Sequence, residues 1–188
     1  MQSQSVVSVN GSRRLLAITQ AVNPVLQQQV ADIDWMSRDW RPDDHYYPGA
    51  IFRRRVLLDQ CELMQAIDTA IFQLIPDINR LCGTMYTTAG SVWHICESGF
   101  VCPMHTDGEK HNVMIMYWQT PGPAFGTTFY NSSDPADIHH EFAGLPNTGF
   151  FANYEPDVGE PWPKMWHASL ASVPVGQYRL MTQYEFHR

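Results

Sequence analysis

The stretch VCPMHTDGEKHN, residues 101–112, places His105 and Asp107 one residue apart. On a β-strand, residues i and i+2 point to the same face. The imidazole and the carboxylate can therefore bind one metal ion together. They can equally form a buried pair in which Asp107 satisfies the N–H of His105. The choice between the two interpretations depends on whether the rest of the chain supplies a third ligand.

From residue 84 onward the sequence pattern is typical of a β protein. Short apolar or alternating runs are separated by turn residues such as Pro121-Gly122-Pro123. Many short strands at regular spacing are typical of a sandwich or barrel. A purely parallel α/β fold is disfavoured because no helices alternate with the strands. The predicted strand runs are residues 91–97, 112–120, 126–131, 148–155, 167–173 and 178–186.

The first 83 residues carry helical signals instead. Asn23 and Pro24 are suited to the N-cap and the first position of a helix. Residues 58–83 repeat apolar side chains at helical spacing, Pro76 should end or kink that helix, and Gly83 marks its exit. These helices should pack on a sheet. A strand is expected between them at about residues 50–57.

Composition narrows the class of protein. The chain has 188 residues, which suits a single domain: we expect residues 1–83 to form a helical and loop support region with the first strands, and residues 84–188 to form the β core that carries the candidate metal ligands. The net charge of −7 argues against a nucleic-acid partner. We find no transmembrane run and no secretory signal, and the four cysteines show no C-x-x-C pair. We therefore expect a cytoplasmic protein with free thiols.

His167 is the best candidate for a third metal ligand. It opens a strand-like run 60 residues after Asp107, and about three strands lie between them. A jelly roll needs such a path to return a later strand to the side of the first. Two histidines and one carboxylate on one face would suit a mononuclear Fe(II) site. Other histidines are weaker candidates. His111 lies too near Asp107 in the sequence, and the polar stretch His139-His140-Glu141 is predicted to lie on the surface.

Arg179 is the candidate anchor for an acidic co-substrate. A dicarboxylate that chelates iron at one end needs a cation for its far carboxylate, and the planar fork of Arg matches that group. Arg179 follows the turn at residues 174–176, so we expect its strand to form a hairpin with the strand of His167. Period two puts Arg179, Met181 and Gln183 on one face. The alternative is an exposed Arg at a sheet edge.

This order, an H-x-D, a distal His and a basic residue about a dozen positions later, resembles the Fe(II)/2-oxoglutarate-dependent oxygenases, in particular their prolyl-hydroxylase-like branch. The resemblance covers roughly residues 90–186. Gly99 and Phe100 occupy the places of a Gly and an aromatic residue that precede the H-x-D in that family. Tyr117 falls where related enzymes place a Tyr that binds 2-oxoglutarate.

The resemblance implies a mainly β fold, a double-stranded β-helix (jelly roll) with N-terminal buttressing α-helices. It implies Fe(II) held by His105, Asp107 and His167, and 2-oxoglutarate held by Arg179, with Tyr117 as a second contact. With O2, such an enzyme decarboxylates 2-oxoglutarate to succinate and CO2 and hydroxylates a C–H bond of its substrate. The expected substrate is a peptide or protein side chain (prolyl-type) or a small amino-acid-like molecule.

Two other functions remain open at this point. One is a cupin-like metal enzyme without 2-oxoglutarate, although cupins generally show H-x-H and a later Glu. The other is a non-catalytic jelly-roll binding module in which His105 and Asp107 form only a buried pair. The mouth of the site is expected among aromatic loop residues, and the oligomeric state is left open. Those aromatic residues are Trp35, Trp40, Tyr46, Tyr47, Trp162 and Trp166.

Overall fold

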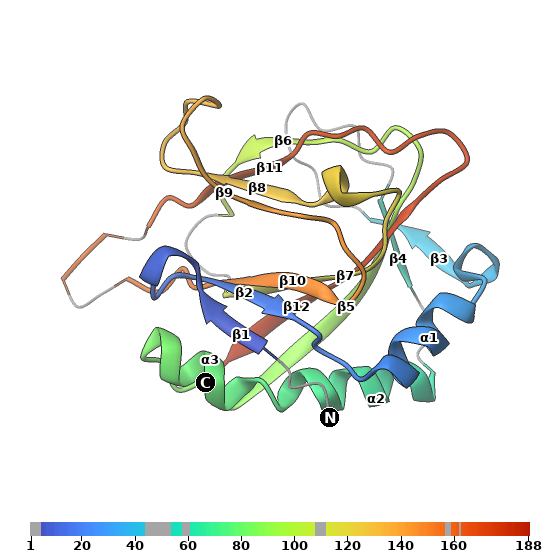
Figure 1. Ribbon diagram of the computed structural model, residues 1–188, viewed down its shortest axis with the longest axis horizontal. Helices are drawn as coiled ribbons and strands as arrows, with labels where there is room; N and C mark the ends of the chain where they lie inside the picture. Colours follow the sequence, from blue (N-terminus) through green and yellow to red (C-terminus); the bar gives the residue numbers. More distant parts are fainter. Residues whose placement is uncertain (1–4, 44–53, 58–60, 108–111, 157–158, 162) are drawn as a thin grey trace.

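Two antiparallel β-sheets lie face to face in the computed structural model, and three helices cover the outer face of the larger sheet (Figure 1). The structure describes residues 5–43, 54–57, 61–107, 112–156, 159–161 and 163–188. The predicted jelly roll with N-terminal buttressing helices is confirmed. Because the sheets face each other, side chains from both can meet in the space between them.

The larger sheet has eight strands among the described residues, and the smaller has four. In spatial order the larger sheet contains β1 (Ser5–Ser8), β2 (Leu15–Thr19), β10 (Thr148–Ala152), β7 (Val113–Gln119), β12 (Arg179–His187), β5 (Thr88–Cys96), β4 (Arg54–Leu57) and β3 (Trp40–Pro42). The smaller contains β6 (Cys102–His105), β11 (Trp166–Ser169), β8 (Thr127–Tyr130) and β9 (Ile138–Phe142).

Each of the six predicted strand runs contains a strand. Strands β1, β2, β3 and β9 were not predicted; the last lies in the polar stretch that holds His139 and His140. A strand was expected at residues 50–57, and β4 occupies Arg54–Leu57, whereas residues 50–53 lie outside the described part.

The helices begin and end close to the predicted residues. In α1 (Pro24–Asp32), the Asn23 side chain accepts a hydrogen bond from the Leu26 N–H at 3.0 Å. Near Pro76 the long helical pattern divides into α2 (Glu62–Phe72) and α3 (Ile75–Cys82), and Gly83 ends α3 in the left-handed region at φ 72°. Short 3-10 turns cover Val9–Gly11, Trp35–Ser37 and Pro123–Phe125. None of the described helices has the length and apolar character needed to cross a membrane.

A stack of three tryptophans joins the helical layer to the larger sheet. The ring of Trp93 on β5 lies between Trp35 and Trp118, with centroid distances of 5.1 Å and 5.7 Å. Trp35 is fully buried, and Trp40 is nearly so. The expectation that these two residues line the mouth of the site is therefore wrong, because they belong to the core. Trp166 is half-buried on β11, and Tyr46, Tyr47 and Trp162 lie outside the described residues.

A second core fills part of the space between the two sheets. Phe129 on β8 makes edge-to-face contacts with Phe142 and Phe150, at 5.8 Å and 5.0 Å. Phe129 also stacks on the imidazole of His167 at 5.3 Å. Aromatic packing therefore fixes the strands of the smaller sheet close to the residues expected to bind a metal.

The predicted hairpin between the strands of His167 and Arg179 is wrong. β11 pairs with β6 and β8 in the smaller sheet, whereas β12 pairs with β5 and β7 in the larger one. Between these strands the chain crosses from sheet to sheet, where the Val173 carbonyl accepts from the Gly99 N–H and the Val173 N–H donates to the Phe100 carbonyl. Arg179 therefore lies on the sheet opposite His167.

Gly126 is required by a close approach of two backbones. A Cβ atom added there would lie 1.8 Å from the Phe142 carbonyl oxygen. We expect Gly126→Ala to lower the free energy of unfolding by about 2 kcal/mol or more, because the backbone of β8 must move away. Chemical denaturation followed by fluorescence measures this change.

Gly90→Ala is the matched control for that variant. Gly90 lies on β5, and no heavy atom lies within 4 Å of a Cβ added there. This substitution should leave the free energy of unfolding unchanged or raise it slightly. Equal losses in both variants would contradict the role given to the Gly126 approach.

Candidate metal centre

The structure brings His105, Asp107 and His167 together. His105 and His167 are directly paired in the register between β6 and β11, and Asp107 follows the end of β6. One potential ligand atom from each residue lies within 4.8 Å of the others. Among the residues that the structure describes, this is the group of three or more His, Cys, Asp or Glu side chains that could hold a metal ion.

Backbone carbonyls orient both imidazoles. Nδ1 of His105 lies 2.8 Å from the Pro103 carbonyl oxygen, and Nδ1 of His167 lies 3.0 Å from that of Met165. A carbonyl only accepts hydrogen bonds, so each Nδ1 carries a hydrogen. Each Nε2 then points to Asp107, at 3.4 Å from Oδ1 for His105 and 3.5 Å from Oδ2 for His167. An N–H bond of this kind to a backbone carbonyl is the usual outer-shell partner of a metal-binding histidine.

Tyr154 fixes the carboxylate between the two imidazoles. Its hydroxyl donates a hydrogen bond to Oδ2 of Asp107 at 3.2 Å. The Tyr154 side chain is 1% exposed, and it follows β10 of the larger sheet. A residue of one sheet therefore positions a ligand carried by the other. This role of Tyr154 was not predicted, since nothing in the local sequence pattern shows which tyrosine reaches Asp107.

The three residues carry opposed pKa shifts. Burial lowers the pKa of His167. Burial acts in the same direction on His105, but hydrogen bonds to Asp107 and Cys102 outweigh it and raise the pKa of His105 to about 10. Burial would raise the pKa of Asp107, but the two neighbouring imidazoles lower it to about 2. In the metal-free protein, a proton on His105 therefore compensates the Asp107 carboxylate, at the place where a cation would bind.

The donor set suits a divalent first-row transition metal. Two imidazole nitrogens and one carboxylate oxygen form the two-His, one-carboxylate pattern that leaves one side of a metal open. The three side chains are 11–18% exposed, which leaves them accessible from one side. The geometry therefore fits a metal that also binds small molecules.

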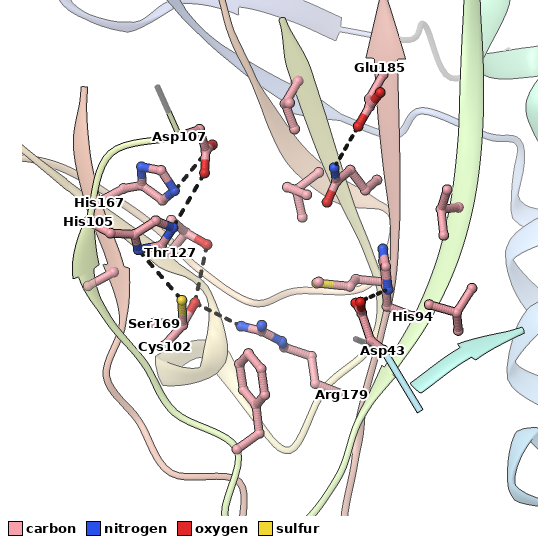
Figure 2. Close-up of a pocket in the computed structure, with 18 of the residues that line it drawn as sticks. Asp43, His94, Cys102, His105, Asp107, Thr127, His167, Ser169, Arg179 and Glu185 are labelled. Atoms are coloured by element: carbon pink, nitrogen blue, oxygen red, sulfur yellow. Dashed lines mark hydrogen bonds and ion pairs between the residues drawn. The ribbon is translucent and has the colours of Figure 1, made fainter. Parts of the chain in front are cut away.

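A cavity of about 410 Å³ opens beside the three residues, between the two sheets (Figure 2). Arg179 lies in its wall on the larger sheet, across from His105 and His167. Met181 and Gln183 line the same wall, so the period-two prediction for this face of β12 is confirmed.

Arg179 is 4% exposed, so the alternative of an exposed edge residue is wrong. Its partners are neutral: Nη1 donates to Ser169 Oγ at 3.0 Å and to the Phe125 carbonyl at 3.2 Å, and Nη2 lies 3.6 Å from Cys96 Sγ. Nε has no hydrogen-bond partner within the described residues. Burial of a guanidinium lowers the stability of the fold unless an anion pairs with it. The described part of the chain forms no ion pair with Arg179.

Tyr117 lies behind the cavity wall. It is fully buried on β7, and its hydroxyl is 2.6 Å from Oγ1 of Thr127. Burial raises the pKa of Tyr117 to about 12, so the hydroxyl stays protonated. Thr127 forms the cavity wall at this point. A contact between Tyr117 and a bound molecule therefore stays a prediction, and Thr127 is the nearer group.

The competing histidines lie elsewhere. His139 and His140 are on β9, at the edge of the smaller sheet, where Nδ1 of His139 contacts Asn131 Oδ1 at 2.9 Å. His111 lies outside the described residues.

His94, which was not among the predicted site residues, also lines the cavity. It is buried on β5, and its Nδ1 lies 3.7 Å from Oδ2 of Asp43, which also lines the cavity. His94 pairs with Met181 in the register of β5 and β12. Only that long-range register identifies it, because the surrounding sequence reads equally well with His94 on either face.

Comparisons with known proteins identify the fold. No protein-family model matches the chain, and no curated protein matches it in sequence. A prolyl-4-hydroxylase from Pseudomonas putida superposes with a TM-score of 0.65 at 14% identity, over 93% of this chain and 92% of that one. The viral collagen prolyl hydroxylase vCPH from Paramecium Bursaria Chlorella virus-1, in its 2-oxoglutarate complex, superposes with a TM-score of 0.59 at 12% identity, over 96% and 98%.

HygX from Streptomyces hygroscopicus, solved with nickel and 2-oxoglutarate bound, superposes with a TM-score of 0.57 at 10% identity, over 91% of this chain and 82% of that one. At these identities the likeness establishes the fold alone. The chain has the jelly-roll fold of the 2-oxoglutarate- and Fe(II)-dependent oxygenases, including the prolyl hydroxylases, as the sequence resemblance implied.

The pKa shifts predict how the stability of the metal-free protein depends on pH. The folded-state pKa of His105, about 10, exceeds its usual value of 6.5, so its contribution is complete below pH 6.5 and disappears as the pH rises toward 10. Asp107 contributes above pH 3.8 and loses this contribution as the pH falls toward 2. Denaturant unfolding with a chelator present should therefore show lower stability at pH 9 than at pH 6.

His105→Gln should flatten that alkaline decline, and the exposed control His187→Gln should retain it. An alkaline decline of the same size in His105→Gln and wild type would contradict the assignment of the proton to His105.

Proposed function

We propose that this chain is an Fe(II)- and 2-oxoglutarate-dependent dioxygenase that hydroxylates a C–H bond. The observation that carries the proposal is one cavity with two complementary ends. At one end, two oriented Nε2 atoms converge on the Asp107 carboxylate. On the opposite sheet, the buried guanidinium of Arg179 has only neutral partners among the described residues. A metal ion and an organic diacid would together satisfy both ends.

His105, Asp107 and His167 are the proposed iron ligands. The backbone carbonyls of Pro103 and Met165 would keep both imidazoles in the tautomer that presents Nε2. Bound iron would supply the activation of O2 coupled to decarboxylation of 2-oxoglutarate, to give succinate and CO2. Tyr154 would hold the carboxylate in place, and the proton of His105 would leave when the metal binds.

Arg179 is the proposed anchor for the far carboxylate of 2-oxoglutarate. Its fork can bind a carboxylate through two hydrogen bonds, and the burial of Arg179 strengthens that pairing. Ser169 and the Phe125 carbonyl hold Nη1, so the guanidinium is preorganised. Thr127 adds a hydroxyl in the cavity wall, and Tyr117 orients that hydroxyl from behind.

The proposed substrate is a peptide or protein side chain of the prolyl type or a small amino-acid-like molecule. The two solved prolyl hydroxylases of the same fold support the first class, and the acidic net charge argues against nucleic acid as a partner. A cytoplasmic location stays a prediction. The protein's residues would position the C–H bond, since the difficult chemistry belongs to the cofactor.

The two alternative functions are less well supported. A metal enzyme without 2-oxoglutarate needs no buried cation across from the metal, and a binding module needs no second histidine on Asp107. Arg179 and His167 each argue for the oxygenase.

Anaerobic addition of Fe(II) and 2-oxoglutarate should produce a weak visible charge-transfer band. His105→Ala or Asp107→Ala should abolish it, because two ligands cannot hold the metal and its chelate in place. His140→Ala, a histidine of the smaller sheet outside the triad, should retain the band. If the wild-type protein shows no such band and calorimetry detects no 2-oxoglutarate binding, the proposal is wrong.

Arg179→Ala should weaken 2-oxoglutarate binding about 100-fold and leave metal affinity nearly unchanged. The loss of one partner of a buried charge pair costs about 3 kcal/mol, which corresponds to this factor. Calorimetric titration of 2-oxoglutarate into metal-loaded protein measures it, with the exposed Arg80→Ala as control. An unchanged affinity in Arg179→Ala would place the anchor elsewhere.

A further inference from the structure

The cavity continues beyond the proposed co-substrate site along one row of residues across the larger sheet. Met181 on β12 is directly opposite His94 on β5, which in turn is opposite Val56 on β4. Val56 is opposite Arg41 on β3, the edge strand among those described. All four residues line the cavity. Neighbouring strands are about 4.8 Å apart, so the row extends about 14 Å from Met181 to Arg41.

The outer end of this row lies past the edge of the smaller sheet. The contact of Thr127 with Tyr117 places β8 opposite β7, and the contact of Ser169 with Arg179 places β11 opposite β12. One step further in both sheets brings β6 opposite β5, and the smaller sheet ends there among the described strands. The row therefore leads outward over β4 and β3, starting beside the metal centre on β6 and β11.

Apolar side chains line much of this path. Val92 lies two residues before His94 on β5, so both residues face the cavity, and Val56 is half-buried on β4. Val92 is 39% exposed, whereas Met181 at the inner end is 5% exposed. A molecule that lies over Val92 and Val56 would remove their apolar surface from water.

Arg41 is an accessible cation at the outer end of the row. It is exposed, and within the described part of the chain its guanidinium forms no hydrogen bond or ion pair. The carboxylate of Asp43, two residues later, lies 3.7 Å from Nδ1 of His94 instead, with its side chain 2% exposed (Figure 2). The chain has a net charge of −7, but salt screens charges beyond about 10 Å, so Arg41 attracts anions locally.

We infer that Arg41 binds a carboxylate of the substrate, and that the rest of the substrate lies over Val56 and Val92 toward the metal centre. The planar guanidinium can hold a carboxylate through two hydrogen bonds. The inference rests on the proposed function and narrows it to substrates with a carboxylate. The same group is found in a free amino-acid-like molecule and in an acidic side chain of a peptide.

Calorimetry on protein saturated with Ni(II) and 2-oxoglutarate tests the inference without turnover. Bound 2-oxoglutarate keeps the carboxylates of the probes away from Arg179. One pair of probes is N-acetyl-leucine and its neutral amide, and the other is the peptide Pro-Ala-Ala-Glu, blocked at both ends, and its Gln counterpart. Each anionic probe that reaches the site should bind about fivefold or more tightly than its neutral counterpart. Such a preference in one pair alone identifies the source of the carboxylate.

Arg41→Gln is the decisive variant because it removes the charge from an exposed position where the fold tolerates substitution. It should weaken binding of the anionic probe about fivefold or more, and leave the affinities for its neutral counterpart and for 2-oxoglutarate unchanged. With Fe(II) and O2, it should raise KM for a probe that is turned over more than it lowers kcat. Arg13→Gln, at an exposed position outside the cavity, is the control and should behave as wild type.

Three results would overturn the inference. They are equal binding of anionic and neutral probes in both pairs, no binding of either anionic probe, and unchanged binding of the anionic probe in Arg41→Gln. In each case normal binding of Ni(II) and 2-oxoglutarate would leave the proposed function intact. Failure of wild-type protein to bind 2-oxoglutarate is a separate result, and it would overturn the proposed function together with this inference.

Discussion

The pairing of His167 with His105 across β11 and β6 is the constraint on which the site depends. It brings together residues that are far apart in the chain, and the nearby carbonyls of Pro103 and Met165 turn both Nε2 atoms toward Asp107. A shift of β11 by one residue would turn His167 to the other face of the sheet. Phe129 stacks on His167 at 5.3 Å and opposes such a shift.

The larger sheet supplies the buried cationic side chain of the cavity and the hydroxyl that positions Asp107. Arg179 enters the cavity from β12, and Tyr154 reaches Asp107 from the end of β10. Arg179 reaches this position because the chain crosses between the two sheets after β11. A buried guanidinium without an anionic partner lowers the stability of the fold, and a bound diacid would offset this loss. The stability of the two-sheet structure is therefore linked to binding of the proposed co-substrate.

The sequence predicted the β class, the helix boundaries at Asn23 and Gly83, the three residues of the triad and the cavity-facing side of β12. Local signals sufficed for the helix boundaries and for the side of β12, because caps and period-two patterns act over a few residues. His167 was predicted instead from the order of the motif along the chain. The partner strand of β12, the contact of Tyr154 with Asp107 and the cavity position of His94 were not predictable. Each depends on a register between strands distant in the chain, which local patterns do not encode.

The most direct test of the central claim is a crystal structure of the protein grown without O2 in the presence of Fe(II) and 2-oxoglutarate. The account predicts anomalous scattering from one iron bound by Nε2 of His105, Nε2 of His167 and a carboxylate oxygen of Asp107, with the far carboxylate of 2-oxoglutarate on Arg179. Iron bound elsewhere, or a diacid that leaves Arg179 without a carboxylate, would contradict it.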